Sequence, residues 1–433
     1  MELSVIVLIV SFVILLALSV PIAIAIGIAT ILTMLFTIPS GPAITTVAQQ
    51  MATGINSFAL LAIPFFILSG QLMGRGGIAR RLVDFAKVLV GMFPGGLAYV
   101  NVLACMFFGA ISGSAAAATS AIGGFMIPMM NKEGYDKNFN TAVTVTGATT
   151  GLLIPPSNVL IVYSLASGGV SIAALFIAGY LPGILVGLGL MSVCAVVAMI
   201  KKYPVGHREK FMVGIRRFFD AIPSLLLVVI VIGGILAGYF TATEASAVAV
   251  LYSLLLSVLF YREVKIRDLP QILLKTVETT AIVMLLIGTS RAMSWILSYE
   301  NIPQNISAAL VSMTDSKFLI LLMINIILLI VGTFMDMTPA VLIFTPIFLP
   351  IVKELGMSPL HFGIVMVLNL CIGLCTPPVG SVLFLGCGIG KTTIASITKS
   401  LLPFFAVMIV SLLLVTYIPW IVEVLPKLFG YSF

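Results

Sequence analysis

The stretch GLLIPPSNV occupies Gly151–Val159, and the similar stretch GLCTPPVGS occupies Gly373–Ser381. Each places two consecutive prolines inside an apolar segment. Each also follows a hydrophobic stretch broken by small and hydroxyl residues, GAISGSAAAATSAIGGFMIP at Gly109–Pro128 and GTFMDMTPAVLIFTPIFLP at Gly332–Pro350. Equivalent positions of the two sets lie 222 or 223 residues apart, so a unit of about half the 433-residue chain is repeated. In membrane transporters, paired interruptions of this kind are the best sequence pointer to a substrate site.

The composition is that of a membrane protein. Hydrophobic residues make up 61% of the chain and charged residues 9%, whereas a soluble globular domain is nearer a quarter charged. Apolar runs long enough to cross a bilayer recur from end to end. Examples are Leu3–Phe36, Ile184–Ile200, Ile222–Phe240 and Leu319–Gly332. We therefore expect an all-α polytopic protein embedded in a lipid bilayer.

The basic residues are clustered in a way that sets an orientation. Of the 22 Lys and Arg residues, 18 fall in five short clusters, and the net charge is +7. By the positive-inside rule, these clusters lie in the cytoplasm. The charge sits in separate loops with no basic domain, which excludes nucleic acid as a partner. The clusters are Arg75–Lys87, Lys132–Lys137, Lys201–Arg217, Arg262–Lys275 and Lys391–Lys399.

This charge pattern predicts two re-entrant hairpins. Phe93–Met130 starts and ends beside inner clusters without a clear second crossing, so it is expected to turn back near Ser112–Ser114. Tyr299–Lys317 is polar and nearly uncharged, which suits an outer loop. Phe318–Glu354 would then enter from outside and turn near Met335–Thr338. Hairpins entering from opposite faces make an inverted repeat.

The chain accordingly divides into five predicted parts. They are N-terminal scaffold helices (1–92), a first hairpin with a broken helix (93–180), scaffold and connecting helices (181–317), a second hairpin with a broken helix (318–400) and a C-terminal helix (401–433).

The two Pro-Pro breaks are where ion chemistry is expected. Proline removes a helical hydrogen bond and clashes with the preceding turn, so two in a row unwind the helix. Freed backbone groups survive at membrane depth only where protein or a water-filled cavity satisfies them. Free carbonyls at such a break suit Na⁺, and helix N-termini suit an anion.

The hairpin tips supply further oxygens. Ser112-Gly113-Ser114 offers two hydroxyls around a glycine that permits close backbone approach, and the second tip offers Thr333, Asp336 and Thr338. Apposing each tip to the break that follows it would make two oxygen-rich cages. The alternative is that the small residues only permit tight helix packing, which is the better interpretation of the Ala117-rich stretch taken alone.

Three ionisable residues lie within or beside apolar segments. Asp336 falls in the second tip, and an ionisable group inside a membrane is by default a functional hypothesis. Arg291, in GTSRAMSWIL, could meet a substrate carboxylate or pair with a neighbouring acid or carbonyl. Glu244, in TATEAS, is better explained as a first-turn carboxylate at a helix N-terminus.

The chain resembles the large membrane subunit of the tripartite ATP-independent periplasmic (TRAP) transporters, the DctM family, over essentially its whole length. The segments that carry the resemblance are AIPFFILSGQLM at Ala62–Met73, GAISGSAAAATSAIG at Gly109–Gly123, GLLIPPSN at Gly151–Asn158, YFTATEASA at Tyr239–Ala247, FMDMTPAVLIFTPIFLP at Phe334–Pro350 and GLCTPPVG at Gly373–Gly380. The resemblance implies an elevator-type transporter of the ion transporter superfamily, in which a mobile unit of hairpins and broken helices slides against a scaffold.

The resemblance also implies the ligands. Na⁺ would be the coupling ion, and the substrate an organic acid such as a C4-dicarboxylate, sialic acid or another sugar acid. The implied substrate residues are Ser114, Ser157, Asp336 and Arg291. The implied first Na⁺ site comprises Ser112, Gly113, Ser114, Gly151, Ile154, Pro156 and Asn158, and the second comprises Gly332, Thr333, Met335, Thr338, Gly373, Thr376 and Pro378.

Partners and location follow from the same resemblance. It implies a small four-helix membrane subunit (DctQ-type), a periplasmic substrate-binding protein (DctP-type) and the bacterial inner membrane. A stand-alone Na⁺/anion symporter of the same superfamily is the main alternative. An intramembrane enzyme would need a paired nucleophile and base or a set of metal ligands, and the sequence offers neither, so we expect no enzymatic activity. Two opposed hairpins argue against a channel.

Overall fold

The computed structural model describes residues 3–205, 211–314 and 316–432, and within them the chain is helical, with an isolated bridge between Pro94 and Val205 as its β-type pairing. The long helices are α1 (Leu3–Ala17), α2 (Ile22–Thr37), α3 (Ser40–Ile55), α4 (Ala62–Arg75), α5 (Ile78–Val90), α6 (Gly96–Ser112), α7 (Ala115–Lys132), α8 (Lys137–Thr150), α9 (Asn158–Ala166), α10 (Ile172–Lys201), α11 (Phe211–Leu236), α12 (Ala242–Leu254), α13 (Leu269–Tyr299), α14 (Ile302–Met313), α15 (Lys317–Phe334), α16 (Met337–Glu354), α17 (Pro359–Leu374), α18 (Ser381–Gly390), α19 (Ile394–Tyr417) and α20 (Trp420–Leu428). Three short helices join them, η1 (Phe58–Leu61), η2 (Leu255–Phe260) and η3 (Ile266–Asp268).

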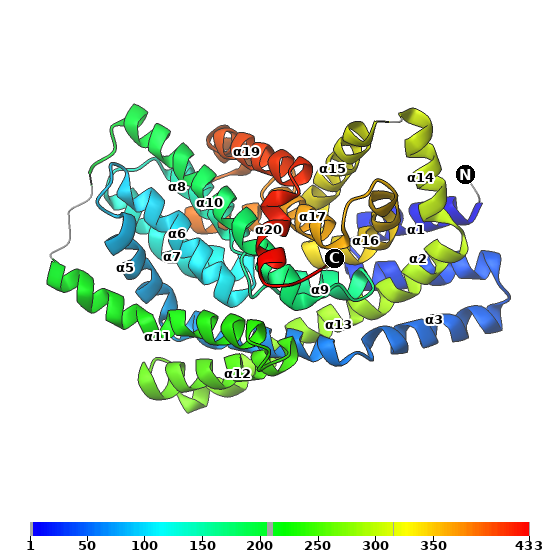
Figure 1. The fold of residues 1–433 in the computed structure, drawn as a ribbon, viewed down its shortest axis with the longest axis horizontal. Coiled ribbons are helices and arrows are strands. Elements are labelled where there is room, and N and C mark those ends of the chain that lie inside the picture. The colour runs from blue at the N-terminus through cyan, green and yellow to red at the C-terminus, as the bar shows by residue number, and fades with distance from the viewer. Residues whose placement is uncertain (1–2, 206–210, 315, 433) are drawn as a thin grey trace.

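Eight helices in the described ranges are long and apolar enough to cross a membrane, which agrees with the predicted polytopic class. Figure 1 shows α5–α8 and α10 gathered at one end of the molecule and α1, α2 and α14–α16 at the other, with α3, α11, α12 and α13 along the lower edge. Within this arrangement α13 packs against α2, α3, α4 and α16. It therefore touches both the N-terminal helices and the second hairpin.

Both predicted hairpins turn where the sequence indicated. α6 ends at Ser112, Gly113 adopts a left-handed φ of +60°, and α7 begins after Ser114. α15 ends at Phe334, and α16 begins after two extended residues, Met335 and Asp336. In each case the chain reverses with no more than two residues outside the helices.

Both predicted breaks are also present. Residues 151–157 separate α8 from α9, and residues 375–380 separate α17 from α18. The Pro155-Pro156 and Pro377-Pro378 bonds are both cis. The second arm of each hairpin packs on the far half of the other broken helix, α7 on α18 and α16 on α9. The four broken or hairpin elements thus form one interlocked unit.

In each half of the chain, the segment at the helix break crosses the first arm of the preceding hairpin at a pair of glycines. A Cβ on Gly151 would lie 2.5 Å from the Cα of Gly109, and a Cβ on Gly373 would lie 2.5 Å from the Cα of Gly332. Only glycine lets the two backbones approach this closely. The crossings bring α8 against α6 and α17 against α15, and so hold each break beside the hairpin that precedes it.

Two scaffold segments contain helix boundaries that the hydropathy pattern does not resolve. The apolar run Leu3–Phe36 forms two helices, because Pro21 disfavours a helical conformation at the preceding residue and Ser19 has a φ of +60°. The predicted outer loop Tyr299–Lys317 contains α14, which begins with Ile302 buried and packs on α16. Polar residues on the other face of α14 lower the hydropathy of the segment, so the sequence pattern alone does not indicate its apolar face.

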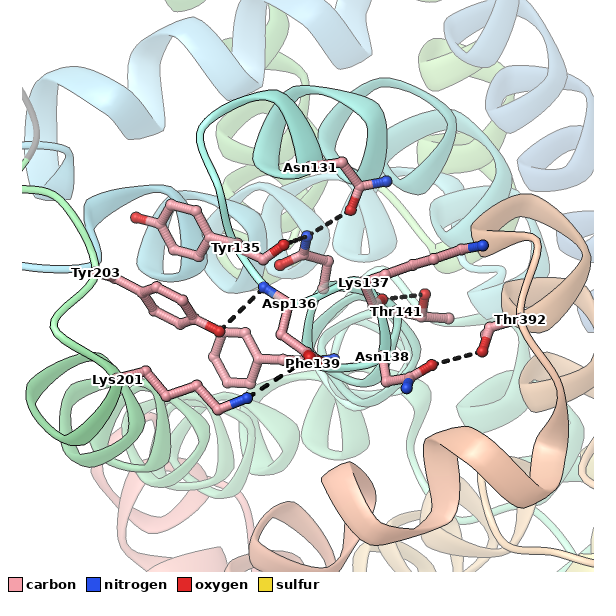
Figure 2. A network of polar contacts seen from close by, with 11 residues as sticks. Asn131, Tyr135, Asp136, Lys137, Asn138, Phe139, Thr141, Lys201, Tyr203 and Thr392 are labelled. Carbon is pink, nitrogen blue, oxygen red and sulfur yellow. Dashed lines mark hydrogen bonds and ion pairs between the residues drawn. The ribbon is translucent and has the colours of Figure 1, made fainter.

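The basic clusters meet one another in space (Figure 2). Asp136 caps α8 by accepting from the backbone N–H of Phe139 at 2.9 Å, and its other oxygen pairs with Lys201 Nζ at 3.6 Å. The backbone N–H of Asp136 donates to the Tyr203 hydroxyl at 3.1 Å. Lys137 donates to the carbonyl of Lys391. Three of the five clusters are therefore joined.

The other two clusters are also joined. Arg75 donates to Gln271 at 2.9 Å, and Arg81 lies 3.7 Å from Glu263. This grouping is what a shared cytoplasmic face requires, although the side of the membrane remains a prediction. Residues 206–210 of the cluster Lys201–Arg217 lie outside the described residues.

Candidate functional site: a cavity where four helices begin

The hairpin tips and helix breaks surround one cavity of about 750 Å³. Ser112–Ala117 and Asn158 line it from the first half, and Asp336–Thr338 and Ser381 from the second. Its remaining wall comes from α4 and α13. The cavity therefore lies between the interlocked unit and the scaffold.

Four helix N-termini reach this cavity, those of α7, α9, α16 and α18. Ser114 caps α7 by accepting from the backbone N–H of Ala117 at 3.2 Å. The residues before the other three helices, Ser157, Asp336 and Gly380, make no side-chain cap. First-turn N–H groups without a cap carry about half a positive charge at a helix end and bind anions readily. The cavity thus favours a negative ligand.

The first tip touches the first break directly. A Cβ on Gly113 would lie 3.1 Å from Asn158 Nδ2, and a Cβ on Gly70 of α4 would lie 2.9 Å from the Ser112 carbonyl oxygen. The Ser112 hydroxyl lies 3.4 Å from both the backbone N and the backbone O of Ser114. The predicted apposition of tip and break is therefore present, with α4 closing it from outside.

Two side-chain oxygens at this contact have no partner. Ser157 Oγ and Asn158 Oδ1 are buried without a hydrogen bond among the described residues. A buried oxygen left unpaired is unfavourable by about 1–3 kcal/mol, so native proteins rarely keep one without a ligand or water. These oxygens, with the serine-rich tip, match the hard-oxygen set that Na⁺ prefers.

The other predicted members of the first Na⁺ site are placed differently. Gly151 packs on Gly109, as described above, and Pro156 is buried. Ile154 lies against α10, where a Cβ on Gly183 would come within 2.5 Å of its side chain. These three residues hold the break in position and do not line the cavity.

The second tip is tied to the second break by the backbone. The N–H of Gly380 donates to the Thr333 carbonyl at 3.0 Å. A Cβ on Gly380, whose φ is +48°, would lie 2.9 Å from the carbonyl oxygens of both Leu374 and Thr376. Two carbonyl oxygens thus lie close to Gly380, an approach that only glycine permits.

Two threonine hydroxyls of the second predicted Na⁺ site already make hydrogen bonds within the protein. Thr333 and Thr376 each donate a hydroxyl to a carbonyl of their own helix at 2.7 Å. Thr338 lines the cavity. Gly332 and Gly373 form the helix crossing, Met335 is buried, and Pro378 follows the cis bond. In the described part of the chain, no group of three or more His, Cys, Asp or Glu residues is placed to hold a metal.

The four predicted substrate residues separate into three positions. Ser114 and Asp336 line the cavity together. Ser157 is fully buried and does not line it, although it ends the break beside it. Arg291 lines a different cavity of about 550 Å³. The structure therefore does not bring Arg291 to Asp336.

Sequence reasoning missed the polar residues on the scaffold wall. Gln71, Arg75 and Thr279 line the cavity, and Arg75 is the only cation among the described residues that do so. From the sequence alone, Arg75 is interpreted only as a charge that sets the topology. Gly70 and Gly74 of α4 lie four residues apart, and this spacing permits close contact with another helix. It therefore indicates that this face of α4 packs against another helix.

A family model for the tripartite ATP-independent periplasmic transporter, DctM component, matches residues 9–421. The C4-dicarboxylate TRAP transporter large permease protein DctM of Pseudomonas aeruginosa is 41% identical over 94% of this chain and 95% of its own. The sialic acid TRAP transporter large permease protein SiaM of Vibrio cholerae is 37% identical over 89% and 90%. The uncharacterised protein YgiK of Salmonella typhimurium is 54% identical over 98% and 97%.

Among solved structures, the chain is similar to the YdaH transporter of Alcanivorax borkumensis, with a TM-score of 0.58 over 90% of this chain and 88% of that one. The sequence identity is 13%, so this likeness concerns the fold alone.

Proposed function

The chain belongs to the DctM family, the large membrane component of the tripartite ATP-independent periplasmic transporters, and from that premise we propose that it takes up an organic acid coupled to Na⁺. The family is one of transporters rather than enzymes. The relatives' names give different acids, C4-dicarboxylates in one case and sialic acid in another. These acids share a carboxylate, and the substrate class proposed here is defined by that group.

The observation that carries the proposal is the convergence of helix N-termini on the cavity. Three of the four lack a side-chain cap. Of these three, α9 and α18 have no carboxylate directly before them, so their N–H groups are free to donate to a substrate's carboxylate. Ser114 adds a hydroxyl at the first tip, and Arg75 adds a positive charge at the scaffold wall. Together these groups can neutralise and orient an anion without a dedicated side-chain clamp.

Asp336 needs a separate role. A carboxylate 4 Å from the substrate's carboxylate would repel it by about 4 kcal/mol at an effective dielectric of 20. We therefore assign Asp336 to a substrate hydroxyl, to a bound cation or to the backbone of its own hairpin. Each of these roles keeps it in the cavity that it lines.

The residues at both tips fit Na⁺. Ser157 Oγ and Asn158 Oδ1 would contribute at the first tip, and the Leu374 and Thr376 carbonyls at the second. Bound Na⁺ would supply positive charge that compensates the anionic substrate. The chain's own contribution is to hold these oxygens beside the helix N-termini that bind the anion.

The arrangement also supports an elevator mechanism built on an inverted repeat. One wall of the cavity belongs to the hairpins and broken helices, and the other to α4 and α13. The interlocked contacts of α7 with α18 and of α16 with α9 would let the first wall move as one body. Sliding of that body along α13 would carry the cavity across the bilayer.

We further propose the inner membrane as the location, with a small DctQ-type membrane subunit and a periplasmic DctP-type binding protein as partners. The partners follow from the family, in which this chain is the large component. A stand-alone symporter is the alternative. Affinity purification of the tagged chain from its native host distinguishes the two, because only the tripartite form brings down a small four-helix protein.

Uptake by proteoliposomes tests the coupling. The permease and its small subunit are reconstituted, and the binding protein is added outside with a labelled acid that it binds. We expect uptake under an inward Na⁺ gradient and little under an equal K⁺ gradient. Equal uptake under both gradients contradicts Na⁺ coupling, and uptake without the binding protein favours the stand-alone alternative.

A further inference from the structure

A second cavity, of about 550 Å³, lies where α3 and α13 face α9 and α16. Its scaffold wall is mostly polar. The α13 residues of this wall recur at three- and four-residue spacing, so they lie on one face of the helix. They are Ile287, Ser290, Arg291, Ser294, Trp295 and Ser298. Gln50, Thr53 and Ser57 continue this wall from α3 and the turn that follows it.

The wall opposite Arg291 is mostly apolar. Five of its eight lining residues are apolar, and the other three are Ser164, Gly168 and Gly169. The apolar ones are Ile161, Leu165 and Ala166 of α9 and Leu342 and Pro346 of α16. A ligand that fills this cavity would therefore meet polar groups on one side and hydrocarbon on the other. Small organic acids, with a charged head and a carbon skeleton, have that character.

Among the residues that the structure describes, Arg291 is the only charged one that lines this cavity. Its side chain is exposed and has no hydrogen bond or ion pair among the described residues, while its stem packs on α3, where a Cβ on Gly54 would lie 2.7 Å from Arg291 Cβ. One position earlier, Ser290 is buried, and its hydroxyl has no partner in the same described part. An unpaired guanidinium that lines a cavity is a ready donor for a carboxylate.

The two cavities are arranged in sequence along α13. Thr279 and Val283 line the first cavity and Arg291 lines the second, so a rise of 1.5 Å per residue separates them by roughly 12–18 Å along the helix. α16 also lines both, with Asp336–Thr338 at the first and Leu342 at the second. Movement of the interlocked unit along α13 toward Tyr299 would bring the first cavity level with Arg291.

We propose that the Arg291 cavity is a second carboxylate-binding site, which holds the acid before the helix N-termini receive it. The Arg291 guanidinium binds the carboxylate, and the α9–α16 wall contacts the carbon skeleton. The place of this site on the transport path rests on the proposed function, but the binding of a carboxylate there does not.

Trp295 offers a direct test because it lines the cavity one turn from Arg291. The chain has two tryptophans, so a Trp420→Phe variant leaves Trp295 as the sole indole. The full-length chain, purified in a maltoside detergent without lipid, is titrated with succinate and separately with sialic acid, with NaCl as the control. We expect a saturable fluorescence change with at least one acid.

Matched variants in the same background locate the response. Arg291→Gln should weaken binding about 10- to 100-fold, the scale of losing a charged hydrogen-bond partner. Arg291→Lys keeps the charge and should retain most of the affinity. Arg80→Gln, the same change at an exposed arginine that lines neither cavity, should leave the response unchanged. This assay needs no transport, partner or Na⁺ gradient, so it stands even if the proposed coupling fails.

Three results overturn the inference. One is the absence of a saturable response to either acid in a monodisperse, folded sample. Another is an unchanged response in Arg291→Gln. The third is a response to added phosphatidylglycerol with none to the two acids, which would make the cavity a lipid headgroup site.

Discussion

The two hairpin tips have the same backbone plan and opposite side-chain chemistry. At the first tip, Ser157 and Asn158 leave buried oxygens without partners, and no charge is present. At the second, Thr333 and Thr376 are satisfied within their own helices, and Asp336 supplies a carboxylate. The repeat therefore preserves a helix geometry rather than a ligand set. In the proposed function, a cation at the first tip would be held by side-chain oxygens and a cation at the second by carbonyls.

The largest expected effect is at the charged tip. Asp336→Ala should abolish Na⁺-driven uptake in proteoliposomes, because it removes the only carboxylate among the described residues that line the first cavity. Asp336→Asn keeps the shape and removes the charge, so it separates a role in charge from a role in hydrogen bonding. Normal uptake by the Ala variant, at matched reconstituted amounts, would remove Asp336 from the site.

The glycine crossings are expected to be equally sensitive in both halves. Ala at Gly151 or at Gly373 would place a Cβ 2.5 Å from the facing glycine backbone, and overpacking of this kind destabilises by about 1–3 kcal/mol or more. Both variants should lower the unfolding temperature by similar amounts, measured in detergent. Gly124→Ala, where a Cβ meets open space, is the matched control. A large loss in only one half would show that the two crossings are not equivalent.

A smaller effect distinguishes the tips by their Na⁺ response. Ser157→Ala removes an oxygen that is free to bind a cation, and it should raise the Na⁺ concentration for half-maximal uptake about tenfold, equivalent to about 1.4 kcal/mol. Thr376→Val removes a hydroxyl already bound to the Ile372 carbonyl, so its effect should be several times smaller. The reverse ranking would contradict the assignment of side-chain oxygens to the first tip.

The smallest expected effect concerns the accessible faces. Ser307→Cys, in α14, should react with a membrane-impermeant thiol reagent added to intact spheroplasts, and Lys391→Cys, beside Lys137, should react only after lysis. The five native cysteines are buried in the protein, so their background should be low. Labelling of Lys391→Cys in intact spheroplasts would overturn the predicted orientation.

The sequence predicted what local chemistry determines. Pro-Pro pairs break a helix through local backbone chemistry, and glycine or acidic residues between apolar helices favour a turn; the helix ends lie at those residues. The interpretation of Glu244 as a helix-start residue is also confirmed, because it completes a capping box with Thr241. These signals need no knowledge of the rest of the fold.

The residues that were missed depend on tertiary contacts. Arg75 reaches the cavity only because α4 crosses the first tip at Gly70, and no local pattern specifies that crossing. Arg291 was grouped with Asp336 by chemistry alone, but it lies eight or more residues along α13 from the part that lines the first cavity. A helix sequence shows which residues share a face, but not which cavity that face meets.

The central claim is that the free helix N-termini bind the substrate's carboxylate. It is tested most directly by a cryo-electron microscopy structure of the transporter with Na⁺ and an acid that its binding protein delivers. The account predicts ligand density in the cavity between the tips, with the carboxylate at the N-termini of α9 and α18 and Asp336 away from it. A carboxylate resolved in the transporter but away from these N-termini, with the cavity between the tips filled by water or side chains, would contradict it.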